Sequence, residues 1–166
     1  AELTGMDISN ASLYDGATAT AEAAMMACAA TKKCDTVLLS ETVDPKVAEV
    51  VDTYAHFHGM RIVRIPESDG TTDFVQMGNL LDNGGVAGVI VQQPNRYGIV
   101  EDLQGVADSC HAHKALLIMN SIAADLAVLK TPGEWGADIA VGEGQSLGIP
   151  MSWGGPFISD TATTEK

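Results

Sequence analysis

The strongest constraint on this chain is a regular alternation of short apolar runs with stretches of helical pattern. The apolar runs are four to six residues long, a length typical of strands buried on both faces of a parallel sheet. Repeated strand–helix–strand units of this size build a sheet with helices packed on both faces. The sequence therefore predicts an α/β domain with three layers, αβα, and a mostly parallel sheet. The expected strands are 36–40, 61–65, 86–91, 115–119 and 138–141, and the expected helices are 17–30, 44–58, 73–81, 102–113 and 123–129.

Residues that favour helix ends support these boundaries. Asp15 precedes the first helix, and Asp44-Pro45 opens the second with an N-cap and a proline in the first turn. Gly59 follows the second helix, in the position where a left-handed glycine commonly ends one. The fifth strand is followed by a glycine-rich stretch and then by a polar tail over residues 160–166. No linker divides the chain, so we expect a single domain over residues 1–166.

The acidic composition excludes several classes of partner. The chain has 166 residues, of which 46% are hydrophobic, and a formal net charge of −13. Such a surface repels a phosphate backbone, and Lys32 and Lys33, just past the first helix, are the only adjacent Lys or Arg pair. No apolar run approaches the roughly 18 residues of a membrane helix, and no signal-peptide pattern is visible. We expect a cytoplasmic protein that binds neither nucleic acid nor a membrane.

Cysteine and histidine spacing predicts no metal site. Cys28, Cys34 and Cys110 lack the spacing of zinc ligands, and we expect them to be buried or idle thiols in a reducing compartment. The histidines form two pairs, 56/58 and 111/113. Residues two apart on a helix do not share a face, so neither pair suits a metal ion.

Polar and glycine-rich segments follow the predicted strands, at the edge of the sheet where ligands of such folds bind. These segments are 40–42, 92–98, 120–121 and 142–148, together with the loop 12–18 before the first helix.

The turn Asp15-Gly16-Ala17-Thr18 is one candidate anion site. It places free backbone N–H groups at a helix start, which suits a phosphate. In the alternative interpretation, Asp15 simply caps the helix. The chain has no Walker pattern and no G-x-G-x-x-G after a strand, so nucleotide hydrolysis and dinucleotide binding lose support.

Two further segments are candidates for a ligand-facing surface. Asn95 and Tyr97 follow a strand that Pro94 ends, and they would stand at the edge of the sheet unless the segment is an ordinary polar turn. Residues 142–156 are dense in glycine, which permits close backbone approach, although a sharp turn in a bulged hairpin is the alternative. The candidates in this second segment are Glu143, Gly144, Gln145 and Ser146.

Together, three stretches resemble the P-protein family of the glycine cleavage system, glycine dehydrogenase (decarboxylating). They are residues 3–19 (LTGMDISNASLYDGATA), 91–95 (VQQPN) and 141–150 (VGEGQSLGIP). The likeness runs over essentially the whole chain and is greatest to the alpha-type half, subunit 1, of P-proteins that are split in two. It implies the large domain of a fold-type I pyridoxal-phosphate enzyme. Because the family subunit is much longer, we expect a truncated piece that lacks an N-terminal segment and the small C-terminal domain.

The resemblance also implies where a catalytic lysine would stand. Pyridoxal phosphate is held as a Schiff base to a lysine, and in the catalytic half of the family this lysine shortly precedes an Ile-Pro pair. Matching that pair to Ile149-Pro150 places Gln145 at the lysine position, and an amide cannot form an imine. Enzymes of this fold hold the pyridine nitrogen protonated with a carboxylate after the fourth strand. The matching places Ile122 near that position, and Asp125 falls in the helix that follows. We expect no lysine at the carboxyl edge of the sheet among Lys32, Lys33, Lys46, Lys114, Lys130 and Lys166.

The resemblance therefore implies a non-catalytic alpha-type subunit. The complete enzyme would decarboxylate glycine and transfer the aminomethyl group to the lipoyl group of the H-protein, with pyridoxal phosphate held by a lysine of the beta-type subunit in a heterotetramer. No catalytic residue and no covalent cofactor are expected on this chain. The alternatives are an autonomous pyridoxal-phosphate enzyme that uses another lysine, such as Lys130, and a binding or scaffold domain without an enzyme partner. The vestigial or shared-site candidates are Asp15, Gly16, Ala17, Thr18, Asn95, Tyr97, Glu143, Gly144, Gln145 and Ser146.

Overall fold

A computed structural model describes residues 1–10, 12–31, 34–154 and 156–165. Its main feature is a seven-stranded sheet in the order β1-β9-β8-β7-β6-β2-β3. The expectations for Lys32, Lys33 and Lys166 lie outside the described residues. The strands are β1 (Ile8–Ser9), β2 (Thr36–Ser40), β3 (Arg61–Ile65), β6 (Val86–Gln92), β7 (Leu116–Ile122), β8 (Ile139–Glu143) and β9 (Ser159–Thr163), and β4 (Glu67–Ser68) and β5 (Thr71–Thr72) form a separate small hairpin.

The sheet is parallel from β3 to β8 and antiparallel beyond it. β2 lies between β3 and β6, and β7 lies between β6 and β8, with every one of these pairs parallel. β9 runs antiparallel to both β8 and β1. The carboxyl ends of five adjacent strands therefore meet along one edge of the sheet.

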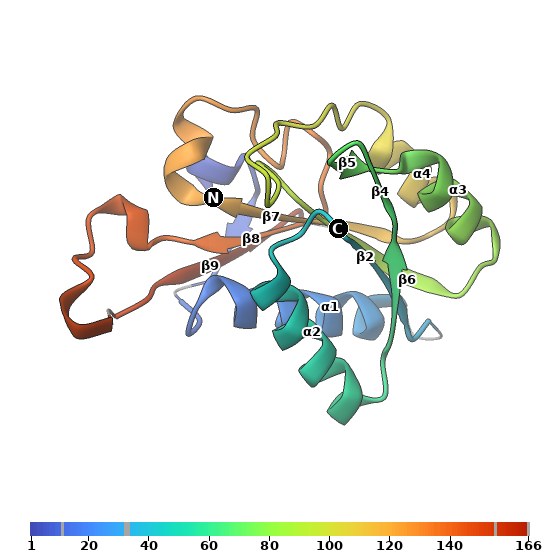
Figure 1. The fold of residues 1–166 in the computed structure, drawn as a ribbon, viewed down its shortest axis with the longest axis horizontal. Coiled ribbons are helices and arrows are strands. Elements are labelled where there is room, and N and C mark those ends of the chain that lie inside the picture. Colours follow the sequence, from blue (N-terminus) through green and yellow to red (C-terminus); the bar gives the residue numbers. More distant parts are fainter. Residues whose placement is uncertain (11, 32–33, 155, 166) are drawn as a thin grey trace.

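Helices cover both faces of this sheet. α1 (Gly16–Thr31) and α2 (Pro45–His58) lie on one face, while α3 (Phe74–Asp82) and α4 (Val106–Ala112) lie on the other (Figure 1). The short 3-10 helices are η1 (Glu2–Thr4), η2 (Ala123–Ala127), η3 (Gln145–Leu147) and η4 (Ser152–Gly154). The predicted three-layer αβα class with a mostly parallel sheet is confirmed.

The apolar core is divided in two by the sheet. On β6, Ile90 packs in the cluster beneath α1 and α2, whereas Val89 and Val91 pack in the cluster with α3 and α4. β7 alternates in the same way, with Ile118 on the first side and Leu117 on the second. Successive side chains of a strand point to opposite faces, so a strand in the middle layer must be apolar at every position.

Several predicted boundaries agree with the structure. β2 and β3 begin and end where the apolar runs do. The Asp44 carboxylate accepts a hydrogen bond from the Lys46 backbone N–H at 2.8 Å, and Gly59 ends α2 with a φ of 70°. These contacts satisfy backbone groups that helix ends leave unpaired.

Three predicted elements need correction. α4 begins at Val106 rather than 102, because Gly105 is left-handed (φ 79°) and interrupts the helical pattern. The expected helix 123–129 is a 3-10 helix over Ala123–Ala127. The polar tail contains a strand, β9, whose Ser159 and Ala162 are buried between neighbouring segments. Pairing with β8 and β1, rather than local apolar pattern, places β9 in the sheet.

Within the described residues, no helix combines the length and hydrophobicity needed to span a membrane.

A histidine between α4 and β7 contacts two hydrogen-bond acceptors. His113 Nδ1 lies 2.8 Å from the Ser109 carbonyl oxygen, and its Nε2 lies 3.0 Å from Asp82 Oδ1. Both partners are acceptors, so only the imidazolium can donate to both. The Ser109 carbonyl, followed by the Asp82 carboxylate, raises the pKa of His113 above its ordinary value.

We predict that His113→Gln destabilises the protein more at pH 5.5 than at pH 8.5. Since the folded pKa is raised, the contribution of His113 is fully present below the unfolded pKa of about 6.5 and is lost as pH rises through the folded pKa. Urea unfolding at both pH values measures the difference, and Asp82→Asn should show the same direction. An equal loss at both pH values would contradict the prediction.

Candidate functional site

Glu143, the last residue of β8, joins three segments at the carboxyl edge of the sheet. Its Oε2 accepts a hydrogen bond from the Gly16 backbone N–H, at the start of α1, over 3.1 Å. Its Oε1 accepts from the backbone N–H groups of Gln145 (3.0 Å) and Ile158 (3.2 Å). A carboxylate at a helix N-terminus is favoured by the unpaired N–H groups and by the helix dipole.

Asp15 occupies the other side of the same helix start. Its Oδ1 accepts from the Thr18 backbone N–H at 2.7 Å, and its carbonyl oxygen accepts from the Ala19 N–H at 2.9 Å. The interpretation of Asp15 as a helix cap is therefore confirmed. Gly16 is buried, whereas Ala17 and Thr18 are half-buried. The structure thus brings the turn 15–18 and Glu143 together, although they lie far apart in the sequence.

An extended arm connects β8 to β9, and the structure describes it over residues 144–154 and 156–158. A 2.6 Å hydrogen bond from the Gly144 N–H to the Ile158 carbonyl extends the antiparallel pairing of β8 and β9, but a long connection stands where the alternative interpretation expected the sharp turn of a bulged hairpin. Gln145 is half-buried and Ser146 exposed. Figure 1 shows the arm, in orange and red, reaching beyond the body of the domain. It carries exposed apolar side chains at Leu147, Met151, Trp153 and Phe157.

Asn95 and Tyr97 lie in a different place from the Glu143 group. The loop that carries them follows β6 and bends toward β2 and the β4–β5 hairpin. The Arg96 N–H donates to the Thr42 carbonyl at 2.8 Å, and Asn95 Nδ2 donates to the Gly70 carbonyl at 2.8 Å. Since β7 lies between β6, which leads into this loop, and β8, which leads into the arm, the site candidates fall into two groups along the edge rather than one.

A buried carboxylate that sequence reasoning missed holds this second group together. Glu101 is 5% exposed, and its Oε1 accepts from Asn95 Nδ2 (2.7 Å) and the Thr42 hydroxyl (3.0 Å). Its Oε2 accepts from the Thr72 backbone N–H at 2.9 Å. The backbone of Glu101 is also bonded in both directions to the Gln93 side chain. No spacing rule distinguishes Glu101 from its exposed neighbour Asp102, so the sequence carried no signal for it.

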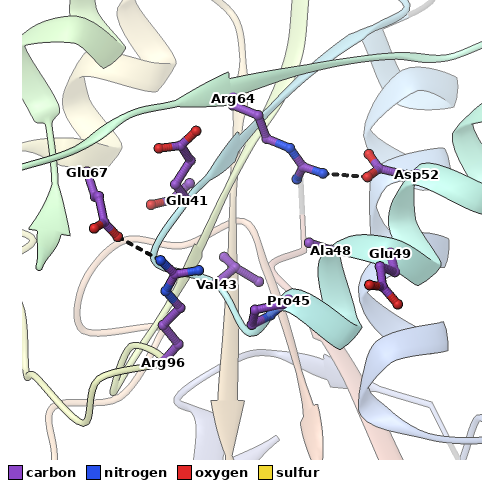
Figure 2. A pocket seen from close by; sticks show the side chains of 10 residues that line it. Glu41, Val43, Pro45, Ala48, Glu49, Asp52, Arg64, Glu67 and Arg96 are labelled. Carbon is purple, nitrogen blue, oxygen red and sulfur yellow. Dashed lines mark hydrogen bonds and ion pairs between the residues drawn. The ribbon is translucent and has the colours of Figure 1, made fainter.

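An open cavity lies beside this second group. It measures about 480 Å³ and is bounded by the ends of β2 and β3, the first turns of α2 and the loop after β6. Figure 2 shows Arg64 turned toward Asp52 and Arg96 turned toward Glu67, with Glu41 between them. The Arg96–Glu67 pair spans 3.0 Å. Tyr97 is half-exposed and donates its hydroxyl proton at 2.7 Å to Oε2 of Glu67, which lines the cavity.

None of the three lysines that the structure describes suits a Schiff base at this edge. Lys114 lies between α4 and β7, at the amino end of that strand. Lys130 Nζ lies 3.7 Å above the Trp135 ring, in the loop that leads into β8. Lys46 contradicts the expectation that no lysine lies at the carboxyl edge, because the first turn of α2 lies at the carboxyl end of β2. Its side chain is exposed and does not line the cavity.

The residues that the structure describes at this edge therefore do not fit pyridoxal phosphate. The helix start that would suit a phosphate already binds Glu143. Ile122, at the position expected for a pyridine-nitrogen carboxylate, ends β7 as a half-exposed apolar residue. Among the described residues, no group of three His, Cys, Asp or Glu side chains could hold a metal ion. Burial raises the pKa of the Cys110 thiol to about 12, so this cysteine stays protonated and inert, as expected.

Comparison with known proteins matches the whole chain to one protein family. The family model described as "Glycine cleavage system P-protein" matches residues 1–166. A "Probable glycine dehydrogenase (decarboxylating) subunit 1" from Desulforamulus reducens is 49% identical over 99% of this chain and 36% of the relative. The protein of the same name from Syntrophomonas wolfei is 48% identical over 99% of this chain and 37% of its own length. The chain thus spans little more than a third of these relatives.

Solved structures agree with these relatives. A crystal structure of glycine decarboxylase (P-protein) of the glycine cleavage system, in inhibitor-bound form, superposes with a TM-score of 0.90 and 42% identity, over 99% of this chain and 36% of that one. A methionine gamma lyase from Micromonospora echinospora superposes with a TM-score of 0.77 at 17% identity, over 99% of this chain and 42% of that one. The second likeness shows the fold alone. The fold class expected from the resemblance is confirmed by both.

We predict that Glu101→Gln lowers the free energy of unfolding by about 1–3 kcal/mol. Each Glu101 oxygen accepts at least one hydrogen bond, so an amide NH₂ in either orientation would face a donor. Chemical denaturation measures the loss. The matched control is Glu49→Gln on the exposed side of α2, expected to stay within about 0.5 kcal/mol of the original protein. Equal stability of the two variants would show that the buried carboxylate does not organise this loop.

Proposed function

The chain belongs to the glycine cleavage system P-protein family, and on that premise we propose that it is the cofactor-type large domain of a non-catalytic, alpha-type subunit. The complete enzyme decarboxylates glycine and transfers the aminomethyl group to the lipoyl group of the H-protein. The lysine that holds pyridoxal phosphate comes from the beta-type subunit, and the two subunit types form a heterotetramer in the cytoplasm. The rest of the alpha-type subunit adds an N-terminal segment and a small C-terminal domain.

The observation that supports this proposal is which residues lie at the carboxyl edge of the sheet, where a cofactor site would need a lysine and a free phosphate turn. Gln145 stands where the resemblance places a lysine, and its backbone N–H donates a hydrogen bond to Glu143 Oε1. The phosphate-type turn at residues 15–18 is closed by Glu143. Both features remove what a cofactor site needs from this chain, while the surrounding fold is retained.

The site candidates suggest how the chain contributes to a shared site. The arm, residues 144–158, projects from the carboxyl edge and carries exposed apolar side chains, which suits contact with the beta-type subunit. The loop of Asn95 and Tyr97 is held rigidly by Glu101, so it presents a defined surface at the same edge. We propose that these two surfaces help to form the shared site and the path of the lipoyl arm.

An autonomous pyridoxal-phosphate enzyme is the second candidate, and Lys130 is the residue that it would use. The position of Lys130 over the Trp135 ring, before β8 rather than after a strand, weighs against this candidate. The third candidate is a scaffold domain without an enzyme partner. Co-purification of a beta-type chain with the protein from its source cell would distinguish the proposed subunit from such a scaffold.

We predict that the purified chain, mixed with pyridoxal phosphate, shows no aldimine absorbance and no glycine decarboxylation. Borohydride reduction followed by peptide mass mapping should find no lysine adduct above the background of a denatured control. Decarboxylation should appear only when the beta-type subunit is present. If an adduct forms, Lys46→Arg and Lys130→Arg identify its position, and loss of the adduct in either variant would refute a non-catalytic role.

A further inference from the structure

α1 has the composition of an interior helix but leaves one flank uncovered. Its sixteen residues include a single charged side chain, Glu22, and the residues that it exposes are Met26, Ala29 and Ala30. Met26 is 41% exposed. A helix that is hydrophobic on every side is normally buried on every side. The exposed flank of α1 therefore suits contact with further polypeptide rather than with water.

This flank borders a groove over the antiparallel end of the sheet. α2 packs against α1 and β3, whereas β9 and β1 lie at the opposite end of the sheet. Two adjoining hollows, of about 250 and 270 Å³, share Met26 and Thr163 and extend from Ile8 to Ala30. Ile8 is itself half-exposed. Since α/β domains cover both faces of their sheet, this α1 groove is where a further layer would lie.

A buried hydroxyl on the floor of the α1 groove lacks a partner. Thr161 is 7% exposed and lines the groove, and its Oγ1 makes no hydrogen bond within the described part of the chain. Thr161 pairs with Val141, which packs in the cluster beneath α1, so the Thr161 side chain lies on the same face. An unpaired buried hydroxyl costs free energy. An occupant that brings a hydrogen-bonding group to Thr161 removes this cost.

The backbone leaves β9 at the α1 groove. Thr163, the last residue of β9, and Thr164 line the groove next to Ala30. The Glu165 N–H donates to Asp7 Oδ2 at 2.9 Å, which keeps the chain beside β1 at this point. Polypeptide that continues from here can enter the groove without crossing the sheet, and its attachment gives it a high effective concentration there.

The start of the chain lies at a different place. Ala1 lines a hollow beside Ala123 and Leu147, at the carboxyl edge of the sheet, whereas Ala30 marks the end of the groove near the amino edge. The chain spans 36% and 37% of two relatives, so the complete subunit of the proposed function has further polypeptide to place. The segment after residue 166 is therefore better placed to fill the groove than one before Ala1.

We propose that, in the complete subunit, the segment that follows residue 166 packs an apolar face into the α1 groove, against Met26, Ala30 and Ile8. One polar group of this segment bonds Thr161 Oγ1. The inference rests on the proposed function, in which this chain is one domain of a longer alpha-type subunit. With the groove filled by its own subunit, the beta-type subunit binds elsewhere, at the carboxyl edge.

A photo-cross-linker at Met26 identifies the occupant. p-Benzoylphenylalanine replaces Met26 in the complete alpha-type subunit, assembled with the beta-type subunit, and the cross-linked peptides are identified by mass spectrometry. The main product should migrate as one subunit and should join residue 26 to a peptide that follows residue 166. The matched control carries the same group at Phe57, which is 79% exposed near the end of α2, and should give no such product.

Met26→Lys should have different effects with and without the segment. In the chain 1–166 the new ammonium group lies four residues after Glu22 on an exposed flank, a spacing that favours the helix, so Tm should stay constant or rise by up to roughly 2 °C. In the complete subunit the substitution buries a charge beneath the packed segment and should lower Tm by at least roughly 2 °C. Phe57→Lys, the matched control, should shift Tm alike in both proteins.

Several results would overturn the proposal. They are a main product that joins residue 26 to the beta-type subunit, to a second copy of this chain or to a segment before Ala1, no product above that of the Phe57 control, and an equal effect of Met26→Lys in both proteins. None of these concerns cofactor chemistry. The proposed function fails instead if this chain forms a borohydride-stable adduct, so the two failures are distinguishable.

Discussion

The close approach of α1 to the sheet is the constraint on which the rest of the structure depends. The helix faces the strands with alanines, among them Ala19, Ala23 and Ala27, which are fully buried. Gly88 of β6 lies beneath Ala27, and a methyl group on that glycine would come within 3.1 Å of the Ala27 side chain. Small residues on both surfaces let the backbones come near each other and bury apolar area without large side chains. This packing brings the start of α1 to the end of β8.

The same geometry explains why a carboxylate of the chain itself lies at the start of α1. A helix start so near a strand end leaves unpaired N–H groups that must be satisfied inside the protein. Glu143 supplies the acceptor for Gly16 and, through its other oxygen, for Gln145 and Ile158. One side chain therefore anchors both ends of the arm to the helix.

The second part of the edge is organised by buried polar groups rather than by apolar packing. Thr42 and Thr72 place hydroxyl groups 3.0 Å apart, and each also bonds Glu101, through a side chain or a backbone N–H. Asn95 completes the network at 2.7 Å from the same carboxylate. Such a network is stable only when every member is satisfied, so it holds the loop after β6 in one arrangement. Sequence reasoning identified Asn95 but missed Glu101, because the partners of a buried carboxylate come from segments that the chain order does not connect.

The sequence by itself determined the layers of the fold, the residue ranges of β2 and β3, the caps of α2 and the family, because these depend on local periodicity and on contiguous motifs. It also identified Asp15–Thr18 and Glu143–Ser146 as separate candidates. Only the tertiary structure decided that Glu143 accepts a hydrogen bond from Gly16, that Tyr97 bonds Glu67 in a separate group, and that the polar segment 159–163 is a strand. Each of these depends on contacts between segments distant in the sequence, and no local pattern encodes the position of a partner that the fold supplies.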